Sequence, residues 1–366
     1  MTLLSNLLLH IPGHSGFSSY VKRVMPGIPG HRLILSDGGR AVCRLDDWLP
    51  QQPPISKRLA LLHRLSLTQH GIDVHATLRR ASIPVESVEA VYSPFCDTLF
   101  ALPHVPQVIT CHDLTPLYCS NSRKAAWRYR YWTPQHLRRA TLVIAISRFV
   151  ADQLIEMGVP AAKLEVIHNG IAVQRPVIDK PCSLDLLMLA RHDRNKNVLN
   201  AVRAFAHLLE RMPQWSGRLV VVGRAGRETQ ALKRVLAGWP QADRVVLKST
   251  VEESELLRLL RSSLALVSAS HMEGYDYPIL EAKAEGLPTL ISDIPVHREI
   301  HDQSSLFFSP DVNGDQFADL VIKLATDNDL WKQLSAAGHQ LASHLTITSQ
   351  QQKIRSVLNQ LILPWT

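Results

Sequence analysis

Short apolar runs alternate with longer stretches of helical periodicity along the chain from residue 88 onward. The runs, such as "TLVIAIS", "RLVVVGR" and "PTLISD", are continuous and are bounded by turn residues. Between them, stretches such as "NVLNAVRAFAHLLERM" place apolar residues three and four positions apart, as one face of an amphipathic helix requires. Continuous apolar strands that alternate with helices are typical of parallel sheets buried on both faces. The pattern therefore predicts a doubly wound α/β architecture.

This alternation is interrupted by "AVQRPVIDKP", residues 172–181, which is polar, aperiodic and contains two prolines. Such a segment is typical of an interdomain linker. We therefore predict two doubly wound domains, 1–176 and 177–349, and a C-terminal helix within 350–366. Ligands of open α/β sheets bind outside the carboxyl ends of the strands, so the cleft between two such domains is the expected site.

Composition agrees with two ordinary globular domains. The chain has 366 residues, of which 46% are hydrophobic and 20% charged. No apolar run approaches the roughly 20 residues of a membrane span. The N-terminal "MTLLSNLLLHIPG" lacks a basic region and contains Asn6, which favours a first buried strand over a signal peptide. Five cysteines without a C-x-x-C pair argue against a disulfide framework or a zinc site and favour a reducing cytoplasm.

The charge balance permits an anionic partner. The formal net charge is +8 and the sequence pI is about 9.4, which suits a nucleic acid, a phospholipid surface or a phosphorylated small molecule. Residues 122–140, "SRKAAWRYRYWTPQHLRRA", interleave six basic residues with four aromatic ones. This mixture suits a membrane surface or a nucleic acid, and a packed helix with a solvated basic face explains it equally well.

Two acids in "HMEGYDYPILEAKAEG", residues 271–286, follow the apolar run "LALVSAS". Pro278 is expected in the first turn of a helix that ends at Gly286. The N-terminus of that helix would face the carboxyl edge of the sheet, where free backbone N–H groups favour an anion. Glu273 and Glu281 could then bind a ligand. When the two acids are considered alone, an alternative explains them equally well: Glu273 is a solvated loop residue, and Glu281 interacts favourably with the helix dipole.

Two cations follow the first strand of the second domain, in "LARHDRNKN". Arg191 as a planar fork and Lys196 as a point charge can neutralise a diphosphate. An ordinary charged loop explains this motif as well when it is considered alone. Since no carboxylate cluster for Mg²⁺ accompanies these cations, no metal site is expected.

Two other predicted strand ends carry candidate binding groups. Gly13 and Gly16, in "IPGHSGFSSYVKRV", precede a helix expected to begin around Ser18. They would let a ligand approach backbone amides, although a plain strand-to-helix turn fits too. His112 and Asp113 end the strand in "VITCHDLTPL". A histidine there can hydrogen-bond a substrate hydroxyl or a backbone carbonyl.

Taken in order, these segments resemble the retaining glycosyltransferases of the GT-B fold, sequence family four, also known as group 1 glycosyl transferases. The resemblance runs from about residue 88 to 345. It rests on the Gly loop at 13–16, "HDLTPL", "AISRFVADQLIEMGVPAAKLEVIHNGI", "LARHDRNKN", "VEESELLRLLRSS" and "SASHMEGYDYPILEAKAEGLPTLISDIPVHREI". It implies two Rossmann-like domains facing a cleft, with the last helix packed back on the N-terminal domain.

The resemblance also implies roles for the candidate residues. A GDP- or UDP-linked sugar would bind mainly to the C-terminal domain and the acceptor to the N-terminal one, without cofactor or metal. Arg191 and Lys196 would hold the diphosphate, and Glu281 the ribose hydroxyls. Glu273, with the backbone of Gly274 and Tyr275, would hold the donor sugar.

On the N-terminal side, the resemblance implies that His112 reaches the sugar across the cleft and that Gly16 lets its loop close over the phosphates. The chain departs from the family pattern at two positions of the acidic loop, where Asp276 replaces Gly and Tyr277 replaces an aliphatic residue. These side chains would alter the pocket beside the donor sugar. The other predicted substrate-binding residues are Gly13, Asp113 and Asn169.

Cleavage of an anomeric C–O bond leaves about two negative charges on the departing diphosphate, so fixed cations lower the barrier. A retaining glycosidase uses a carboxylate nucleophile about 5 Å from an acid/base partner. No such pair is evident in this sequence. Glu273 is therefore expected to position the sugar, and the resemblance implies front-face attack aided by the departing phosphate.

The sequence as a whole predicts a cytoplasmic, metal-independent hexosyltransferase at the inner face of the cell membrane. Mannose or a related sugar is favoured, transferred to a cell-surface polysaccharide or a lipid-linked glycan. Residues 122–140 would contact the anionic membrane, and no nucleic acid partner is expected. Two alternatives stay open: a sugar-nucleotide epimerase or phosphorylase on the same fold, and a non-catalytic basic scaffold that binds membrane or nucleic acid.

Overall fold

The computed structural model describes residues 2–8, 10, 16–35, 41–44, 74–96, 102, 104–173, 179–311 and 314–362. The chain forms two compact units. Unit 1 contains Met1–Leu114, Trp127–Gly170 and Ile347–Thr366, and unit 2 contains Thr115–Ala126 and Ile171–Thr346. Two assignments differ from the sequence-based domains: residues 115–126 lie with the second unit, and the C-terminal helix begins at residue 347. The predicted boundary at residue 176 lies outside the described residues.

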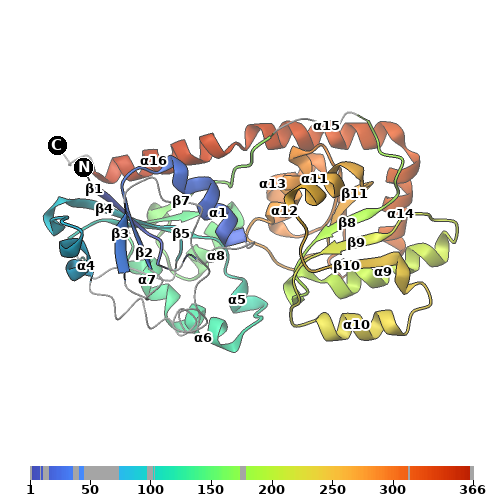
Figure 1. Cartoon of the computed structure of the whole chain (residues 1–366), viewed down its shortest axis with the longest axis horizontal. Helices are drawn as coiled ribbons and strands as arrows, with labels where there is room; N and C mark the ends of the chain where they lie inside the picture. The colour runs from blue at the N-terminus through green and yellow to red at the C-terminus, as the bar shows by residue number, and fades with distance from the viewer. Residues whose placement is uncertain are drawn as a thin grey trace. The chain divides into compact units, whose positions relative to one another are not determined.

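Unit 1 is built on a seven-stranded sheet in the order β3-β2-β1-β4-β5-β6-β7 (Figure 1). Its strands are β1 (Thr2–Asn6), β2 (His31–Leu35), β3 (Ala41–Arg44), β4 (Val88–Ser93), β5 (Gln107–Cys111), β6 (Leu142–Ala145) and β7 (Leu164–Val166). The pair β2–β3 is antiparallel, and the other neighbouring pairs are parallel. The predicted first strand is confirmed, since β1 lies next to the central β4 with its last four residues buried.

The helices of unit 1 connect these strands. They are α1 (Gly16–Val24), η1 (Met25–Gly27), α4 (Val74–Arg80), η2 (Val85–Ser87), α7 (Thr133–Arg139), α8 (Arg148–Glu156), η3 (Ala161–Lys163) and α16 (Ile347–Ile362), with α6 (Arg123–Tyr131) shared with unit 2. The C-terminal α16 contacts α1, η1 and β4. Its Gln351 side chain donates to the Arg23 carbonyl oxygen over 2.8 Å. The last helix therefore completes the unit in which the chain begins.

Unit 2 is built on a six-stranded parallel sheet in the order β10-β9-β8-β11-β12-β13. Its strands are β8 (Leu186–Leu189), β9 (Leu219–Val222), β10 (Val245–Lys248), β11 (Ala265–Ser268), β12 (Thr289–Ser292) and β13 (Leu306–Phe308). Its helices are α5 (Thr115–Tyr118), η4 (Arg194–Lys196), α9 (Val198–Arg211), α10 (Thr229–Ala237), η5 (Ala242–Arg244), α11 (Glu253–Ser262), α12 (Tyr277–Ala284), α13 (Pro295–His301), η6 (Asp302–Ser304), α14 (Gly314–Thr326) and α15 (Asn328–His344).

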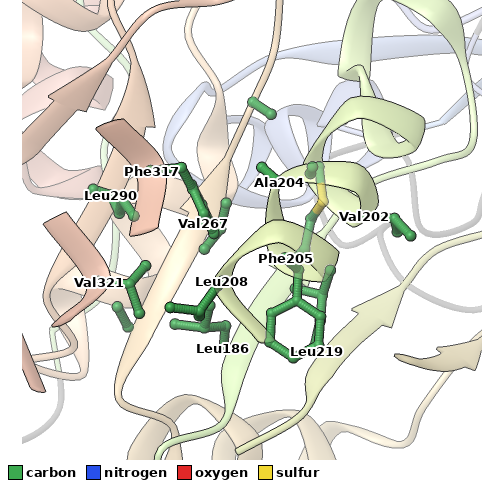
Figure 2. Close-up of a cluster of buried hydrophobic side chains, with 14 of the residues drawn as sticks. Leu186, Val202, Ala204, Phe205, Leu208, Leu219, Val267, Leu290, Phe317 and Val321 are labelled. Carbon is green, nitrogen blue, oxygen red and sulfur yellow. The ribbon is translucent and has the colours of Figure 1, made fainter. Parts of the chain in front are cut away.

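Both faces of the unit 2 sheet are covered, as doubly wound architecture requires. One face packs against α9 and α14, where Phe205 and Phe317 are fully buried in the same apolar cluster as Leu186 (Figure 2). The other face packs Leu187 against residues of α11 and α12, among them Ile279. Each such side chain stabilises the fold by about 1.5–3 kcal/mol. The continuous apolar strands thus gave the correct architecture, and the order of strands places the ends of β8 and β11 side by side.

Candidate functional site

The loop after β8 carries a cation held between two acids. Residues 190–197 leave β8, turn through η4 and enter α9. The Nζ atom of Lys196 lies 2.7 Å from Oε1 of Glu273 and 2.9 Å from Oδ1 of Asp276. Both acids belong to the loop after β11, the strand next to β8. The structure therefore brings together two motifs that lie about 80 positions apart in the sequence.

The acidic loop ends at an unusual backbone conformation. Asp276 precedes α12 with φ 66° and ψ 69°, in the left-handed region that glycine, asparagine and aspartate enter most readily. Pro278 lies in the first turn of α12, and Gly286, after its end, has φ 72°. The predicted helix with its proline and its terminal glycine is confirmed. The turn at Asp276 directs a carboxylate inward, toward Lys196.

Burial and pairing act in opposite directions on the three charges. Burial raises the pKa of Glu273, Lys196 opposes this effect, and Asp276 adds to it, so that the pKa reaches about 7. Burial would also raise the pKa of Asp276, but Lys196 and His297 together hold it well below its usual range. Burial would lower the pKa of Lys196, whereas the two acids raise it above its usual value. Near neutral pH, Lys196 is thus charged, Asp276 is ionised, and Glu273 is close to its titration midpoint.

Two buried side chains behind Asp276 complete this cluster. Ser268 donates its hydroxyl to Oδ2 of Asp276 over 2.6 Å, and Nε2 of His297 lies 3.4 Å from the same oxygen. The other ring nitrogen of His297, Nδ1, donates to the Ser292 carbonyl oxygen over 2.8 Å. Ser268 and His297 were not predicted from the sequence. A signal was available, because Ser268 is the last residue of β11 and "IPVHREI" follows β12.

A short segment from the N-terminal half of the sequence also reaches the cluster. Asn195 donates its side-chain amide to Oε1 of Glu273 over 3.4 Å, and its amide oxygen accepts a 3.0 Å bond from Asn121. Asn121 belongs to Thr115–Ala126, the segment that lies in unit 2. Cys119, in the same segment, is close enough to Glu273 for the acid to raise the pKa of its thiol, after the larger effect of burial. No local pattern predicted this placement.

Arg191 differs from Lys196 in exposure. Its side chain is 64% exposed and lies 3.4 Å from the Asp193 carboxylate. The adjacent chain after β9 approaches closely, since a Cβ atom at Gly223 would lie 1.9 Å from the Ala190 carbonyl oxygen. Only glycine fits there. The edge around Arg191 is basic and accessible, with Arg194, Arg224 and Arg227 also exposed.

The other residues predicted around the acidic loop are mostly buried. Tyr275 and Tyr277 are 3% and 8% exposed, with ring centroids 5.9 Å apart. Burial, with Tyr277 and Glu299 nearby, raises the pKa of Tyr275 well above its usual value. Gly274 is buried, and Glu281 is half-buried. Glu281 was expected in the first turn of the helix, but it is the fifth residue of α12, because the helix begins only at Tyr277, so no acid lies in its first turn. The two tyrosines are therefore packed inside the loop, whereas Glu281 keeps a partly exposed side chain.

His112 occupies an aromatic environment in unit 1. Its Nε2 donates to the Pro94 carbonyl oxygen over 2.8 Å, and the rings of Phe17 and Tyr20 approach it edge-on with centroids 4.9 and 4.5 Å away. Burial lowers the pKa of His112 to about 4, with the Pro94 bond as a smaller opposing effect. His112 is therefore neutral at physiological pH, with Nδ1 as its acceptor nitrogen. The prediction that this position could contact a carbonyl is confirmed.

The remaining predicted residues of unit 1 are dispersed. Gly16 is the first residue of α1, slightly earlier than the expected helix start near Ser18. Asp113 follows His112 and is half-buried. Asn169 is 1% exposed, and its Oδ1 accepts a 3.0 Å bond from Gln350 of α16, so its side chain serves the attachment of that helix. Gly13 lies outside the described residues.

The basic and aromatic segment forms two helices, of which α6 has no buried residue and α7 buries Thr133, His136 and Leu137. Trp127 and Tyr131 are 57% and 55% exposed, with ring centroids 5.8 Å apart. The exposed cations of the same helix are Arg123, Lys124 and Arg130. Between the two open interpretations of residues 122–140, this exposure disfavours a packed aromatic face for α6.

The described part of the chain contains no helix that combines the length and the hydrophobicity of a membrane span. Within the same residues, no group of three His, Cys, Asp or Glu side chains is arranged to hold a metal ion.

Comparison with known families and proteins gives consistent matches. Residues 177–341 match the family Glycosyl transferases group 1, and residues 88–175 match Glycosyltransferase Family 4. The chain is 26% identical over 220 residues to the O-antigen chain mannosyltransferase RfbU of Salmonella typhimurium, covering 59% of this chain and 60% of that protein. It is 30% identical over 195 residues to the GDP-mannose:cellobiosyl-diphosphopolyprenol alpha-mannosyltransferase of Xanthomonas oryzae pv. oryzae, covering 51% and 50%. The aligned part is thus less than two thirds of each relative's length.

Among solved structures, the chain is similar to HepE of Anabaena in complex with UDP and glucose. The TM-score is 0.70 at 16% identity, and the match covers 98% of this chain and 99% of that one. At this identity the likeness establishes the fold, which is GT-B.

Proposed function

Because the chain belongs to the group 1 glycosyl transferases, we propose that it transfers a hexosyl unit from a nucleotide-diphosphate sugar to a hydroxyl of a cell-surface polysaccharide or lipid-linked glycan. The observation that carries the proposal is the meeting of Lys196, Glu273 and Asp276 at the carboxyl edge of the unit 2 sheet. A buried ion cluster at that edge suits a polar ligand with both charge and hydroxyl groups.

The donor sugar is proposed to be mannose or a related hexose, linked to GDP or UDP. Both mannosyltransferase names among the relatives support mannose, and one of those names specifies GDP-mannose. UDP is the nucleotide held by HepE, whose likeness to this chain concerns the fold.

The chemistry assigns separate tasks to the charged groups of unit 2. Departure of the nucleotide diphosphate increases its negative charge, which Arg191 and the α12 N-terminus would stabilise. Glu273 would bind sugar hydroxyls, and Glu281 the ribose. The anomeric configuration would be retained by front-face attack, with a diphosphate oxygen accepting the proton of the attacking hydroxyl, and no metal would be required.

Binding of the acceptor is proposed to involve unit 1. His112 is instead proposed to serve the donor sugar, from one of whose hydroxyls it would accept a hydrogen bond at Nδ1, because its Nε2 already donates to the Pro94 carbonyl oxygen. The exposed face of α6, with Trp127, Tyr131 and its cations, would contact an anionic membrane at the cytoplasmic side. A lipid-linked acceptor would be concentrated there.

Ligand-induced stabilisation tests the proposal directly. The melting temperature is measured with GDP, UDP, ADP and their hexose conjugates at millimolar concentration, where a nucleotide at about 100 times its Kd stabilises by about 2.7 kcal/mol. We expect one nucleotide to raise the melting temperature and Arg191→Ala to reduce that rise. Arg203→Ala, on the exposed side of α9, is the matched control. Failure of every nucleotide to stabilise the wild type would contradict the proposed function.

A further inference from the structure

Asp276 is a buried acid at a position that favours glycine. Its side chain is 1% exposed, and its backbone is in the left-handed region with φ 66°. A buried carboxylate is costly unless hydrogen bonds and charges compensate it, and side chains other than Asn and Asp rarely adopt this backbone. The contacts of the carboxylate should therefore explain why an acid occupies this position.

Both carboxylate oxygens of Asp276 are engaged. Oδ1 is 2.9 Å from the Lys196 ammonium, and Oδ2 accepts from Ser268 over 2.6 Å and faces His297. The His297 ring is itself fixed by its bond to the Ser292 carbonyl oxygen. Since Ser268 and His297 both contact Oδ2, these two residues orient the carboxylate. That orientation determines where Lys196 points.

The Lys196 ammonium is directed to the sugar-binding acid. It has three N–H donors, and within the described residues the structure gives it two acceptors, Asp276 and Glu273. Two acids around one cation leave little net positive charge to attract a diphosphate. Arg191, with its 64% exposed side chain, keeps its charge accessible beside Asp193. The two cations of the edge are thus in different electrostatic states.

We propose that Asp276, supported by Ser268 and His297, is a positioning residue that holds Lys196 against Glu273, so that Lys196 orients the donor sugar while Arg191 binds the diphosphate. This inference rests on the proposed function, and it assigns different roles to the two cations that the family resemblance places together at the diphosphate. The third N–H group of Lys196 is the one that can donate a hydrogen bond to an oxygen atom of the donor sugar. Removal of the Asp276 charge would release Lys196 toward the diphosphate.

The test compares nucleotide affinity with turnover in Asp276→Asn and Asp276→Gly, which both tolerate the positive φ. UDP and GDP binding is measured by calorimetry, and kcat with the donor that the wild type uses. We expect both variants to bind the nucleotide diphosphate about threefold to tenfold more tightly, since a negative charge is removed. We expect kcat to fall roughly ten- to a hundredfold, since the sugar is less well oriented. A loss of folding alone would not strengthen binding.

A second pair of variants isolates Lys196. As a single substitution, Lys196→Met should change nucleotide affinity less than about twofold relative to the wild type. In the double variant it should weaken affinity severalfold relative to Asp276→Asn alone, because in Asp276→Asn the Lys196 side chain can reach the phosphates. Lys323→Met and Asp319→Asn, both on α14, serve as matched controls. Thermal melting of each variant shows that the protein is folded.

A pH profile gives a further independent reading. The groups facing Glu273 are Lys196 and Asp276, with Cys119 of the 115–126 segment nearby and His297 behind Asp276. The wild-type pH dependence of kcat should inflect near 7, and Asp276→Asn should move the inflection to lower pH, because the acid that raises the pKa of Glu273 is gone.

The proposal is overturned if Asp276→Asn keeps kcat within about twofold of the wild type, binds the nucleotide more weakly, or leaves the pH profile in place. If the wild type binds no nucleotide, the proposed function fails instead. A wild type that binds and turns over, with unchanged Asp276 variants, refutes only the positioning role.

Discussion

Lys196 in unit 2 and His112 in unit 1 are polar side chains that are stabilised in different ways. Lys196 is charged and is compensated by two acids within 2.9 Å. His112 is neutral, makes one hydrogen bond to a backbone carbonyl, and is otherwise enclosed by aromatic rings. A charged cluster responds strongly when one member is lost, because the remaining charges stay buried. A neutral group in an aromatic pocket responds mainly through shape. The two regions should therefore differ in their sensitivity to mutation, pH and salt.

The largest effect is expected from Glu273→Ala. Because Glu273 is placed at the sugar and Lys196 remains paired with Asp276, transfer should fall at least about a hundredfold while nucleotide binding is retained. Steady-state transfer and calorimetric nucleotide affinity measure the two quantities. Glu210→Ala, on the surface of α9, is the control. Loss of nucleotide affinity in Glu273→Ala would show that this acid serves the nucleotide and would remove the contrast between its role and that of Arg191.

Lys196→Met tests the stability side of the charged region. Without the ammonium, two largely buried carboxylates lose their cation, and we expect the free energy of unfolding to fall by about 3 kcal/mol at pH 8. The loss should be smaller at pH 6, where Glu273, whose pKa is about 7, can take up a proton. Chemical denaturation at both pH values measures this difference. An equal loss of unfolding free energy at both pH values would show that the two acids do not interact with the Lys196 charge.

His112→Gln should have a smaller effect on activity. Glutamine keeps an N–H donor for the Pro94 carbonyl oxygen but lacks the ring that packs against Phe17 and Tyr20. We expect transfer to fall about tenfold through lost orientation of the sugar, with little change in nucleotide affinity. The transfer rate at saturating donor and the inhibition by competing nucleotide measure these two quantities separately. A hundredfold loss, equal to that of Glu273→Ala, would put both residues in one catalytic role.

The smallest effect is a pH dependence of stability in unit 1. The pKa of His112 is about 4 in the folded chain and about 6.5 when unfolded, so between these values the unfolded state binds more protons. Its contribution is fully present above pH 6.5 and is lost as the pH falls toward 4. His112→Gln should reduce this acid-induced loss by on the order of 1–2 kcal/mol. Urea denaturation from pH 7 to 4.5 measures it; identical slopes in both proteins would exclude His112 as the source.

The fold was largely predictable because strand burial leaves a local signature. Runs such as "LVVV" of β9 indicate strands buried on both faces wherever they occur. Pro278 and Gly286 likewise marked the limits of α12 through local backbone preferences. The antiparallel β3 was not predicted, because residues 38–87 have no clear period.

The site was predictable only in part. Arg191, Lys196, Glu273 and Glu281 could be assigned to strand ends, and strand ends of one parallel sheet share an edge. Nothing local indicated that Lys196 would be bound between two acids or that His297 would stand behind Asp276. Those contacts depend on side-chain directions across β8, β11 and β12, which the tertiary structure alone determines.

The composition of the two units has a consequence for synthesis on the ribosome. Unit 1 contains the first 114 residues and also α16, which begins at Ile347, while the whole main part of unit 2 lies between them. The sheet of unit 1 therefore lacks α16 until the strands of unit 2 have been synthesised. During that interval the surface that α16 covers on α1 and β4 is exposed. Completion of unit 1 is therefore coupled to the synthesis of a helix that follows every strand of unit 2.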